Sequence, residues 1–179
     1  MMSDTANTNS QRNLAKTINH LVARFNVKHE VFRGDHVLEV SPDQIIDFCK
    51  VLRDEENFEM LIDETAVDFW PQEEPRFHII YQLRSISRNE ILTVRTPLNG
   101  NEPEIASLTS VYPNADWYER ELWDLMGIRF GGHPDLRRIL MPHDWVGHPL
   151  RKDYPLGYEE PQFTFNFEEI DLRKPYAKE

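Results

Sequence analysis

One short helical segment carries the three carboxylates that are best placed to do chemistry, Glu119, Glu121 and Asp124. Glu121 and Asp124 are three residues apart, so a helix places them on one face, as an acid/base pair requires. Arg120, however, lies four residues from both Asp116 and Asp124, and that spacing favours salt bridges. We therefore expect structural ion pairing here, with acid/base catalysis by Glu121 and Asp124 as the alternative.

The histidines and the single cysteine give little support for a metal site or a nucleophile. His133, His143 and His148 lie on a segment interrupted by prolines, without the i,i+4 helical spacing of a hydrolytic zinc site. Because Cys49 is the only cysteine, this chain alone cannot form a disulfide or a cysteine-ligated zinc or iron–sulfur centre. Cys49 lies on the apolar face of a predicted helix, so we expect it in the core. The sequence also lacks a glycine-rich phosphate-binding pattern.

Composition and charge narrow the classes of protein further. The chain has 179 residues and a net charge of −11, which disfavours binding to nucleic acid. Its apolar runs are far shorter than the roughly 18 residues that a membrane span needs. Residues 39–90 hold 13 acidic and 5 basic residues, so most of the negative charge lies there. A solvated acidic face is the simpler interpretation, and a docking face for a basic neighbour is the alternative.

The elements that must position these residues follow an α+β order. Residues 1–12 are small and polar and are expected to be disordered. Residues 13–130 are expected to form one domain, with a mixed or antiparallel sheet and helices packed on it. The predicted helices are residues 14–25, 42–52, 104–111 and 115–126, and the predicted strands are residues 27–32, 36–40, 58–69, 76–84 and 91–96. Ser41 and Pro42 have the residue types of a helix start, with the hydroxyl as cap.

The last part of the sequence, residues 131–179, has a different character. It contains six of the 12 prolines, which exclude long helices and central strands. It is also rich in aromatic residues, and a disordered tail would expose them to water. We therefore predict a long extended proline-rich C-terminal arm that wraps a partner subunit, and an arm that wraps its own domain is the alternative. Arginine pairs in this arm, such as Arg137 and Arg138, could grip carboxylates on another surface bidentately.

A long motif spans the predicted helix and the first half of the arm. Residues 118–128 have the sequence Tyr-Glu-Arg-Glu-Leu-Trp-Asp-Leu-Met-Gly-Ile. Residues 132–140 and 147–155 follow as Gly-His-Pro-Asp-Leu-Arg-Arg-Ile-Leu and Gly-His-Pro-Leu-Arg-Lys-Asp-Tyr-Pro. Together these segments resemble the signature of the C-type (30 kDa) subunit family of respiratory complex I, the proton-translocating NADH:quinone oxidoreductase. The subunit-interface residues that the resemblance implies are Glu119, Arg120, Glu121, Asp124, Gly127, His133, Pro134, Arg137, Arg138, Gly147, Pro149, Leu150, Arg151, Lys152, Asp153, Tyr154 and Pro155.

The resemblance implies a cofactor-free, non-catalytic subunit in the quinone module of the peripheral arm. FMN, iron–sulfur clusters and quinone would be held by partner subunits. Those partners would be the large subunit of D type, the iron–sulfur subunits of B and I types and other peripheral-arm subunits. The chain would lie peripherally on the cytoplasmic side of the inner (plasma) membrane. A scaffold subunit of a photosynthetic NDH-type or membrane-bound hydrogenase complex is the alternative.

Overall fold

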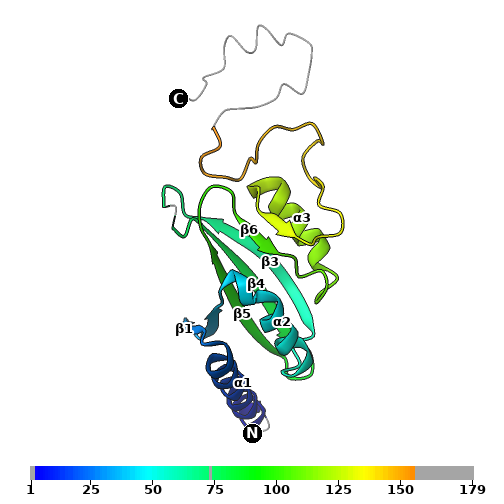
Figure 1. Cartoon of the computed structure of the whole chain (residues 1–179). Helices are drawn as coiled ribbons and strands as arrows, with labels where there is room; N and C mark the ends of the chain where they lie inside the picture. The colour runs from blue at the N-terminus through cyan, green and yellow to red at the C-terminus, as the bar shows by residue number, and fades with distance from the viewer. Residues whose placement is uncertain (1–2, 73, 156–179) are drawn as a thin grey trace, which may run out of the picture.

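A five-stranded mixed sheet forms the centre of the molecule in the computed structural model, which describes residues 3–72 and 74–155 (Figure 1). The strands are β1 (Lys28–Phe32), β2 (Asp35–Glu39), β3 (Met60–Asp68), β4 (Phe77–Ser85) and β5 (Glu90–Leu98). Their order in the sheet is β1-β2-β5-β4-β3, and only the β2–β5 pair is parallel. The predicted α+β class with a mixed sheet is therefore confirmed.

The turn between β1 and β2 is the hairpin that the sequence predicts. Arg33 and Gly34 both have positive φ angles, of 54° and 95°, which fit the twist of a two-residue hairpin turn. Phe32 consequently pairs with Asp35, and the register runs from there to the pairing of Lys28 with Glu39. β1 is thereby fixed as one edge of the sheet.

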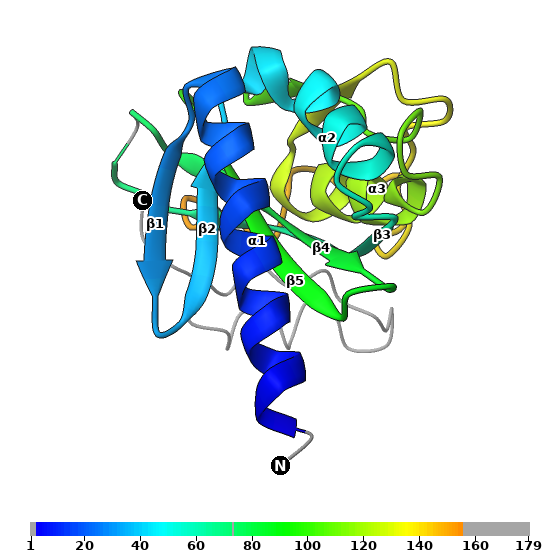
Figure 2. The ribbon, with the colours of Figure 1, turned by 90° about the horizontal axis from the view of Figure 1, so that it is seen from below.

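Helices lie across one face of the sheet, as Figure 2 shows for α1 (Ser3–Phe25) and α2 (Ile45–Asp54). α1 begins at Ser3, so the structure describes residues 3–12, which the sequence predicts to be disordered, as the first turns of this helix. Pro42 opens a short 3₁₀ turn (Pro42–Gln44) before α2, but Ser41 makes no side-chain cap. In the described part of the chain, no helix is long and apolar enough to cross a membrane.

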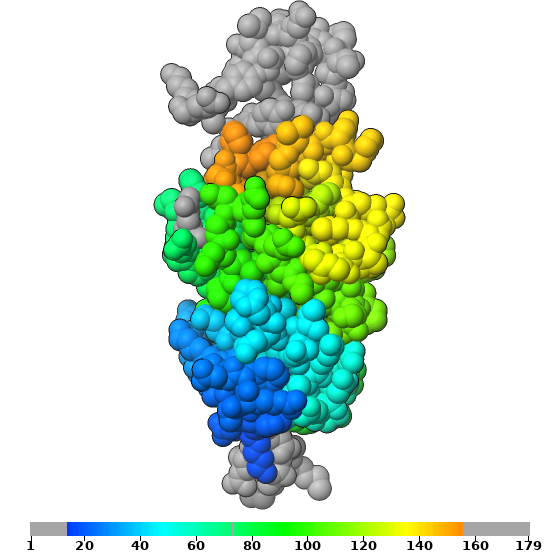
Figure 3. All heavy atoms as spheres, viewed as in Figure 1, coloured from blue at the N-terminus to red at the C-terminus, as the bar shows by residue number. Residues whose placement is uncertain are grey.

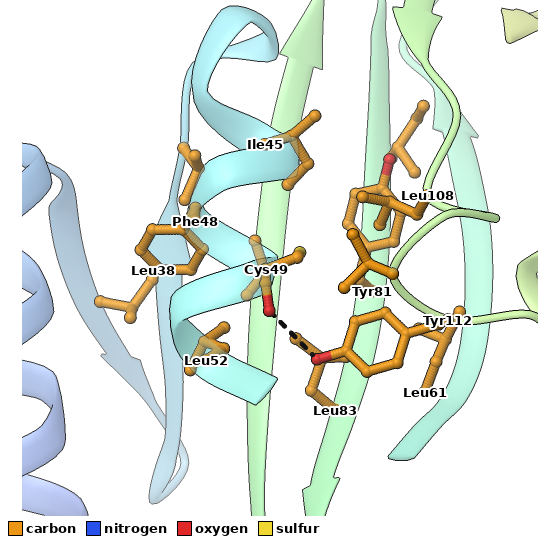
Figure 4. Packing of buried hydrophobic residues seen from close by; sticks show 14 of the residues in the cluster. Leu38, Ile45, Phe48, Cys49, Leu52, Leu61, Tyr81, Leu83, Leu108 and Tyr112 are labelled. Carbon is orange, nitrogen blue, oxygen red and sulfur yellow. Dashed lines mark hydrogen bonds between the residues drawn. The ribbon is translucent and has the colours of Figure 1, made fainter. Parts of the chain in front are cut away.

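The core lies between α2 and the sheet (Figure 4). Phe48, Cys49 and Leu52 of α2 are fully buried, as their helical spacing predicts. The hydroxyl of Tyr112 donates hydrogen bonds to the carbonyl of Phe58 at 2.9 Å and to that of Cys49 at 3.5 Å. Burial raises the pKa of the Cys49 thiol far above its usual value, so the thiol is an inert core group.

Two short strands replace part of a predicted helix. Residues 104–111 were expected to be helical, but β6 (Glu104–Ala106) pairs in parallel with β7 (Arg129–Gly131). The prediction was wrong because the pairing partner lies far along the chain, beyond the reach of local periodicity. The pairing brings the start of the arm back to the domain directly after α3 (Ala115–Met126).

The described part of the arm, residues 131–155, packs on its own domain. Figure 3 shows these atoms covering the end of the molecule opposite α1. Their backbone is irregular, as the prolines require, but it is tied to α3 and to β3 by hydrogen bonds. Up to residue 155 the arm thus lies on its own domain, because polar contacts between distant segments attach it. The remaining arm residues, 156–179, lie outside the described residues.

Candidate functional site

α3 ends at Met126, and the turn at Gly127 directs the arm back along the helix, toward its carboxylates. Gly127 adopts the left-handed conformation with a φ angle of 74°, and its N–H donates to the carbonyl of Trp123. A glycine at this position ends helices in many proteins, since it has no Cβ to clash. A Cβ on Gly127 would lie 2.6 Å from the ring of His148. The turn therefore fixes the direction of the chain and lets the arm approach closely.

Asp124 is the main anchor of the arm. Its Oδ2 accepts hydrogen bonds from three consecutive backbone amides, those of Ile139, Leu140 and Met141, at 2.8 to 3.0 Å. Its Oδ1 accepts a 2.6 Å bond from Nη1 of Arg138, and the Asp124 side chain is fully buried. Burial alone would raise the pKa of Asp124, but the amide and guanidinium donors outweigh it and hold the pKa below its usual range.

The remaining N–H groups of Arg138 donate hydrogen bonds to backbone carbonyls of α3 and of the arm. Its Nη2 donates to the carbonyls of Trp145 and Gly147 at 2.8 and 3.0 Å, and Nη1 reaches the Asp124 carbonyl at 3.1 Å. The amide of Leu150 then donates to the carbonyl of Leu125 at 2.9 Å. One arginine thus joins two separate turns of the arm to the end of α3.

A second anchor lies at the end of β3, where Arg76 is completely buried between two carboxylates. Its Nε and Nη2 donate to the two oxygens of Asp68 at 3.0 Å, and Nη2 lies 2.8 Å from Asp153 of the arm. The Lys152 amide donates to Asp68 at 2.9 Å. The hydrogen bond from Arg76 lowers the pKa of Asp153 to about 2. This guanidinium also lies over the ring of Trp70, 4.7 Å from its centroid.

Glu119 forms a third, more deeply buried contact. Its carboxylate accepts 2.6 Å hydrogen bonds from the Ser107 hydroxyl and the Leu108 amide, which fix the loop after β6. Nε2 of His133, whose side chain is buried, lies 3.2 Å from Asp116 and 3.9 Å from Glu119. Burial raises the pKa of Glu119 to about 7. It also raises the pKa of Glu64 in β3, which is fully buried.

The expected ion pairs within α3 do not form. Arg120 donates to the carbonyls of Arg137 and Arg138, at 3.2 and 3.4 Å, instead of pairing with Asp116 or Asp124. That expectation was wrong because it considered only neighbours on the helix, whereas the arm supplies nearer partners. Ion pairing itself is correct for Asp124, whose partner is on the arm.

An acid/base pair of Glu121 and Asp124 does not fit the structure. Glu121 is exposed, whereas Asp124 is buried and both of its carboxylate oxygens accept hydrogen bonds from the arm. Nor do His133, His143 and His148 come together as ligands: the residues that the structure describes contain no group of three or more side chains able to hold a metal ion. The geometry is that of a structural clamp, in which the side chains of Asp124, Arg138 and Arg76 hold the arm on the domain.

The signature residues divide into two sets. Those that hold the arm in place include the buried ones described above and Gly147, where a Cβ would meet the ring of Tyr154 at 2.8 Å. Arg151 joins them by donating to the carbonyl of Asn101 at 2.9 Å, and Pro149 is half-buried. The exposed ones are Glu121, Pro134, Arg137, Leu150, Lys152 and Pro155. Asp153 is exposed as well, but it belongs to the first set because it pairs with Arg76. The second set presents the most surface to another protein.

Sequence reasoning missed the residues on the domain side of two contacts. Asp68 and Arg76 stand at the facing ends of β3 and β4, and no local motif connects them to Asp153. Ser107 was assigned to a helix. Glu64 faces the core beside a bulge between Leu61 and Asp63, which breaks the alternation that would have shown its direction.

The fold and the clamp together define a small α+β domain with a firmly attached arm. The family model described as "Respiratory-chain NADH dehydrogenase, 30 Kd subunit" matches residues 38–160. The C-type subunit of the NADH-quinone oxidoreductase of Roseiflexus sp. (strain RS-1) is 46% identical, over 83% of this chain and 86% of the relative. The same subunit of Geobacter sulfurreducens is 44% identical, over 70% of this chain and 77% of the relative. The chain belongs to this 30 Kd subunit family.

Solved structures agree with the fold. A trypsin-resistant fragment of Nqo5 superposes with a TM-score of 0.62 at 25% identity, covering 69% of this chain and 99% of the fragment. A chain of the membrane-bound sulfane sulfur reductase, an archaeal respiratory membrane complex, gives a TM-score of 0.65 at 20% identity, covering 92% of this chain and 95% of that one. The second likeness is one of fold alone.

Proposed function

We propose that this chain is a cofactor-free, non-catalytic scaffold subunit of a complex I-type NADH:quinone oxidoreductase. In that role it helps to keep the quinone module in a fixed geometry, while electrons pass from NADH through FMN and iron–sulfur clusters to quinone, coupled to proton translocation. The observation that carries the proposal is the arm. It is held by buried ion pairs, yet it exposes the apolar side chains of Leu140, Val146 and Leu150.

That exposed apolar surface supports a docking role. Leu140, Val146 and Leu150 have 62%, 76% and 55% of their surface exposed, and covering such apolar side chains with a partner is favourable. A rigid arm also loses little conformational entropy on binding. The curated relatives are named as subunits of NADH-quinone oxidoreductase, which supports partners from that complex.

The proposed partners are the large quinone-module subunit of D type and the iron–sulfur subunits of B and I types. FMN, the clusters and the quinone would lie in those partners. The proposed location is peripheral, on the cytoplasmic side of the inner membrane. The exposed signature residues, such as Arg137 and Lys152, would contact the partner, whereas buried ones such as Asp124 would set the shape of the arm.

Affinity purification of the tagged full-length chain from gently solubilised membranes tests this function. The proposal predicts that the large subunit and the iron–sulfur subunits of the quinone module co-purify in equal amounts. It also predicts that the purified chain alone neither oxidises NADH nor binds a metal stoichiometrically. Recovery of the chain by itself, or NADH oxidation by the isolated chain, would refute the proposal.

A further inference from the structure

Arg120 is a nearly buried cation with no carboxylate beside it. Only 8% of the residue is exposed, and no acidic oxygen of the described residues lies within salt-bridge distance. Its contacts are the two arm carbonyls, reached by Nε and Nη2, and the ring of Trp117, 5.2 Å from the guanidinium carbon. Nη1 has no hydrogen-bond acceptor among the described residues. Nη1 is not a fully buried atom, so this donor is open to solvent. A guanidinium with an accessible free donor and no carboxylate beside it is available to bind an anion.

Arg120 also lines an open hollow between α3 and the arm. The hollow has a volume of about 420 Å³ and is lined by Arg120, Arg137, Arg138 and His143, with Trp123 beside them. None of the described side chains that line it is acidic. On a chain with a net charge of −11, this is a local concentration of positive charge.

The three arginines of the hollow differ in how far they are already neutralised. Arg138 is paired with the buried Asp124 at 2.6 Å and is not free to bind another anion. Arg137 is 70% exposed and makes a 2.8 Å contact with the exposed Asp135, an ion pair that solvent weakens. Arg120 therefore has the charge that lacks a counterion, and Arg137 is a movable cation at the rim.

We propose that this hollow, termed the Arg120 pocket, receives an acidic side chain of the subunit on which the arm docks. A carboxylate accepts two parallel hydrogen bonds from a guanidinium, which fits the unused donors of Arg120. The apolar surface of Trp123 and Leu136 would exclude water around the pair. The inference rests on the proposed function, because that function supplies the partner, and it adds the chemistry by which the partner is recognised.

Zero-length carbodiimide cross-linking of the purified complex tests the occupant directly, since the reagent joins an amine only to a carboxylate in contact with it. The Arg137→Lys variant places such an amine at the rim of the pocket. We expect an adduct between residue 137 and an Asp or Glu of another subunit, mapped by mass spectrometry. The Arg33→Lys variant, at the remote hairpin turn, is the matched control and should give no such adduct.

Adducts confined to this chain would overturn the inference. A link only to Asp135 would mean that no acidic side chain of another subunit lies in the pocket. A link to an acidic residue in residues 156–179 would mean that the chain's own tail is the occupant. Both results are compatible with co-purification of the large subunit, so they would leave the proposed function standing.

Charge reversal at the rim gives an independent readout. Arg137→Glu should reduce retention of the large subunit by about tenfold or more, because like charges that face each other are strongly unfavourable. Arg33→Glu should leave retention unchanged, and neither exposed substitution should shift the urea midpoint of the isolated chain. Equal retention of the large subunit by the wild type and Arg137→Glu would overturn the inference about the Arg120 pocket and leave the proposed function standing. Failure of the wild type to retain the subunit would overturn the proposed function as well.

Discussion

At the residue scale, the contacts of Asp124 show why a carboxylate in this signature is structural. One oxygen accepts three backbone amides and the other accepts the Arg138 guanidinium. A carboxylate has about four lone-pair positions, so these donors leave it little capacity to exchange a proton with a substrate. The same contacts make its removal costly, because three amides and one cation would lose their partner together.

Asp124→Ala is therefore expected to destabilise the chain by about 3–5 kcal/mol, the usual cost of breaking a buried ion pair. Urea unfolding followed by tryptophan fluorescence measures this change. Asp135→Ala is the matched control, since Asp135 belongs to an exposed pair and should cost less than about 1 kcal/mol. Similar losses for the two variants would show that the Asp124 contacts are not the anchor.

Glu119 predicts a specific pH dependence of stability. Its pKa is raised to about 7, so the folded chain holds this proton more tightly than the unfolded chain does. The free energy of unfolding should therefore fall as pH rises from about 4.5 to about 7 through this group. Glu119→Gln removes that titration, so the variant should lose less stability than the wild type between about pH 5 and about pH 8.

Urea midpoints at the two pH values provide the comparison. Glu121→Gln is the control, because Glu121 is exposed on the same helix and should leave the profile unchanged. Glu64 also has a raised pKa, so some slope should remain in the Glu119→Gln variant. Parallel profiles for the wild type and Glu119→Gln would contradict the assignment.

At the element scale, the success of sequence reasoning depended on how local the determining contacts are. α3 was predicted with its observed bounds because its apolar periodicity and Gly127 both lie within one short segment. The β1–β2 hairpin was predicted for the same reason. β6 was missed because its identity depends on β7, which follows only after the whole of α3.

Gly127 offers a sharp test at this scale, because it combines a left-handed backbone with close contact to the arm. Gly127→Ala adds backbone strain of about 1 kcal/mol, as any residue with a Cβ would. It also places a Cβ 2.6 Å from His148, which should displace the arm. We expect faster cleavage of residues 131–155 by trypsin than in the wild type.

Gly132→Ala is the matched control for this prediction. Gly132 has a similar φ angle of 84°, but a Cβ there has no atom within 4 Å. The Gly132→Ala control therefore adds the same backbone strain but no contact between the new Cβ and another residue. Equal trypsin sensitivity of the two variants would mean that His148 does not hold the arm at this point.

At the scale of the whole molecule, residues 131–155 are part of the folded domain and not an appendage. The sequence indicated irregular chain there, which the structure bears out, but it did not show where that chain lies. The attachment depends on single polar groups such as Arg76 and Asp124, which are brought together only by the tertiary fold. No spacing rule predicts such pairs.

Truncation after residue 130 should consequently destabilise the domain. It removes Asp153 from the buried Arg76 and leaves the buried Asp124 without its donors. We expect a urea midpoint clearly below that of a chain ending at residue 155, because buried charges that lose their partners are costly. Identical midpoints for the two chains would contradict the arm's place in the domain.

We propose above that the signature carboxylates hold a docking arm and take no part in chemistry. The most direct test replaces the subunit in membranes with the Asp124→Asn variant and measures NADH:quinone turnover per assembled complex. We expect less assembled complex, with an unchanged turnover rate for each complex that does assemble. Complexes that assemble in full yet lose their turnover would contradict it.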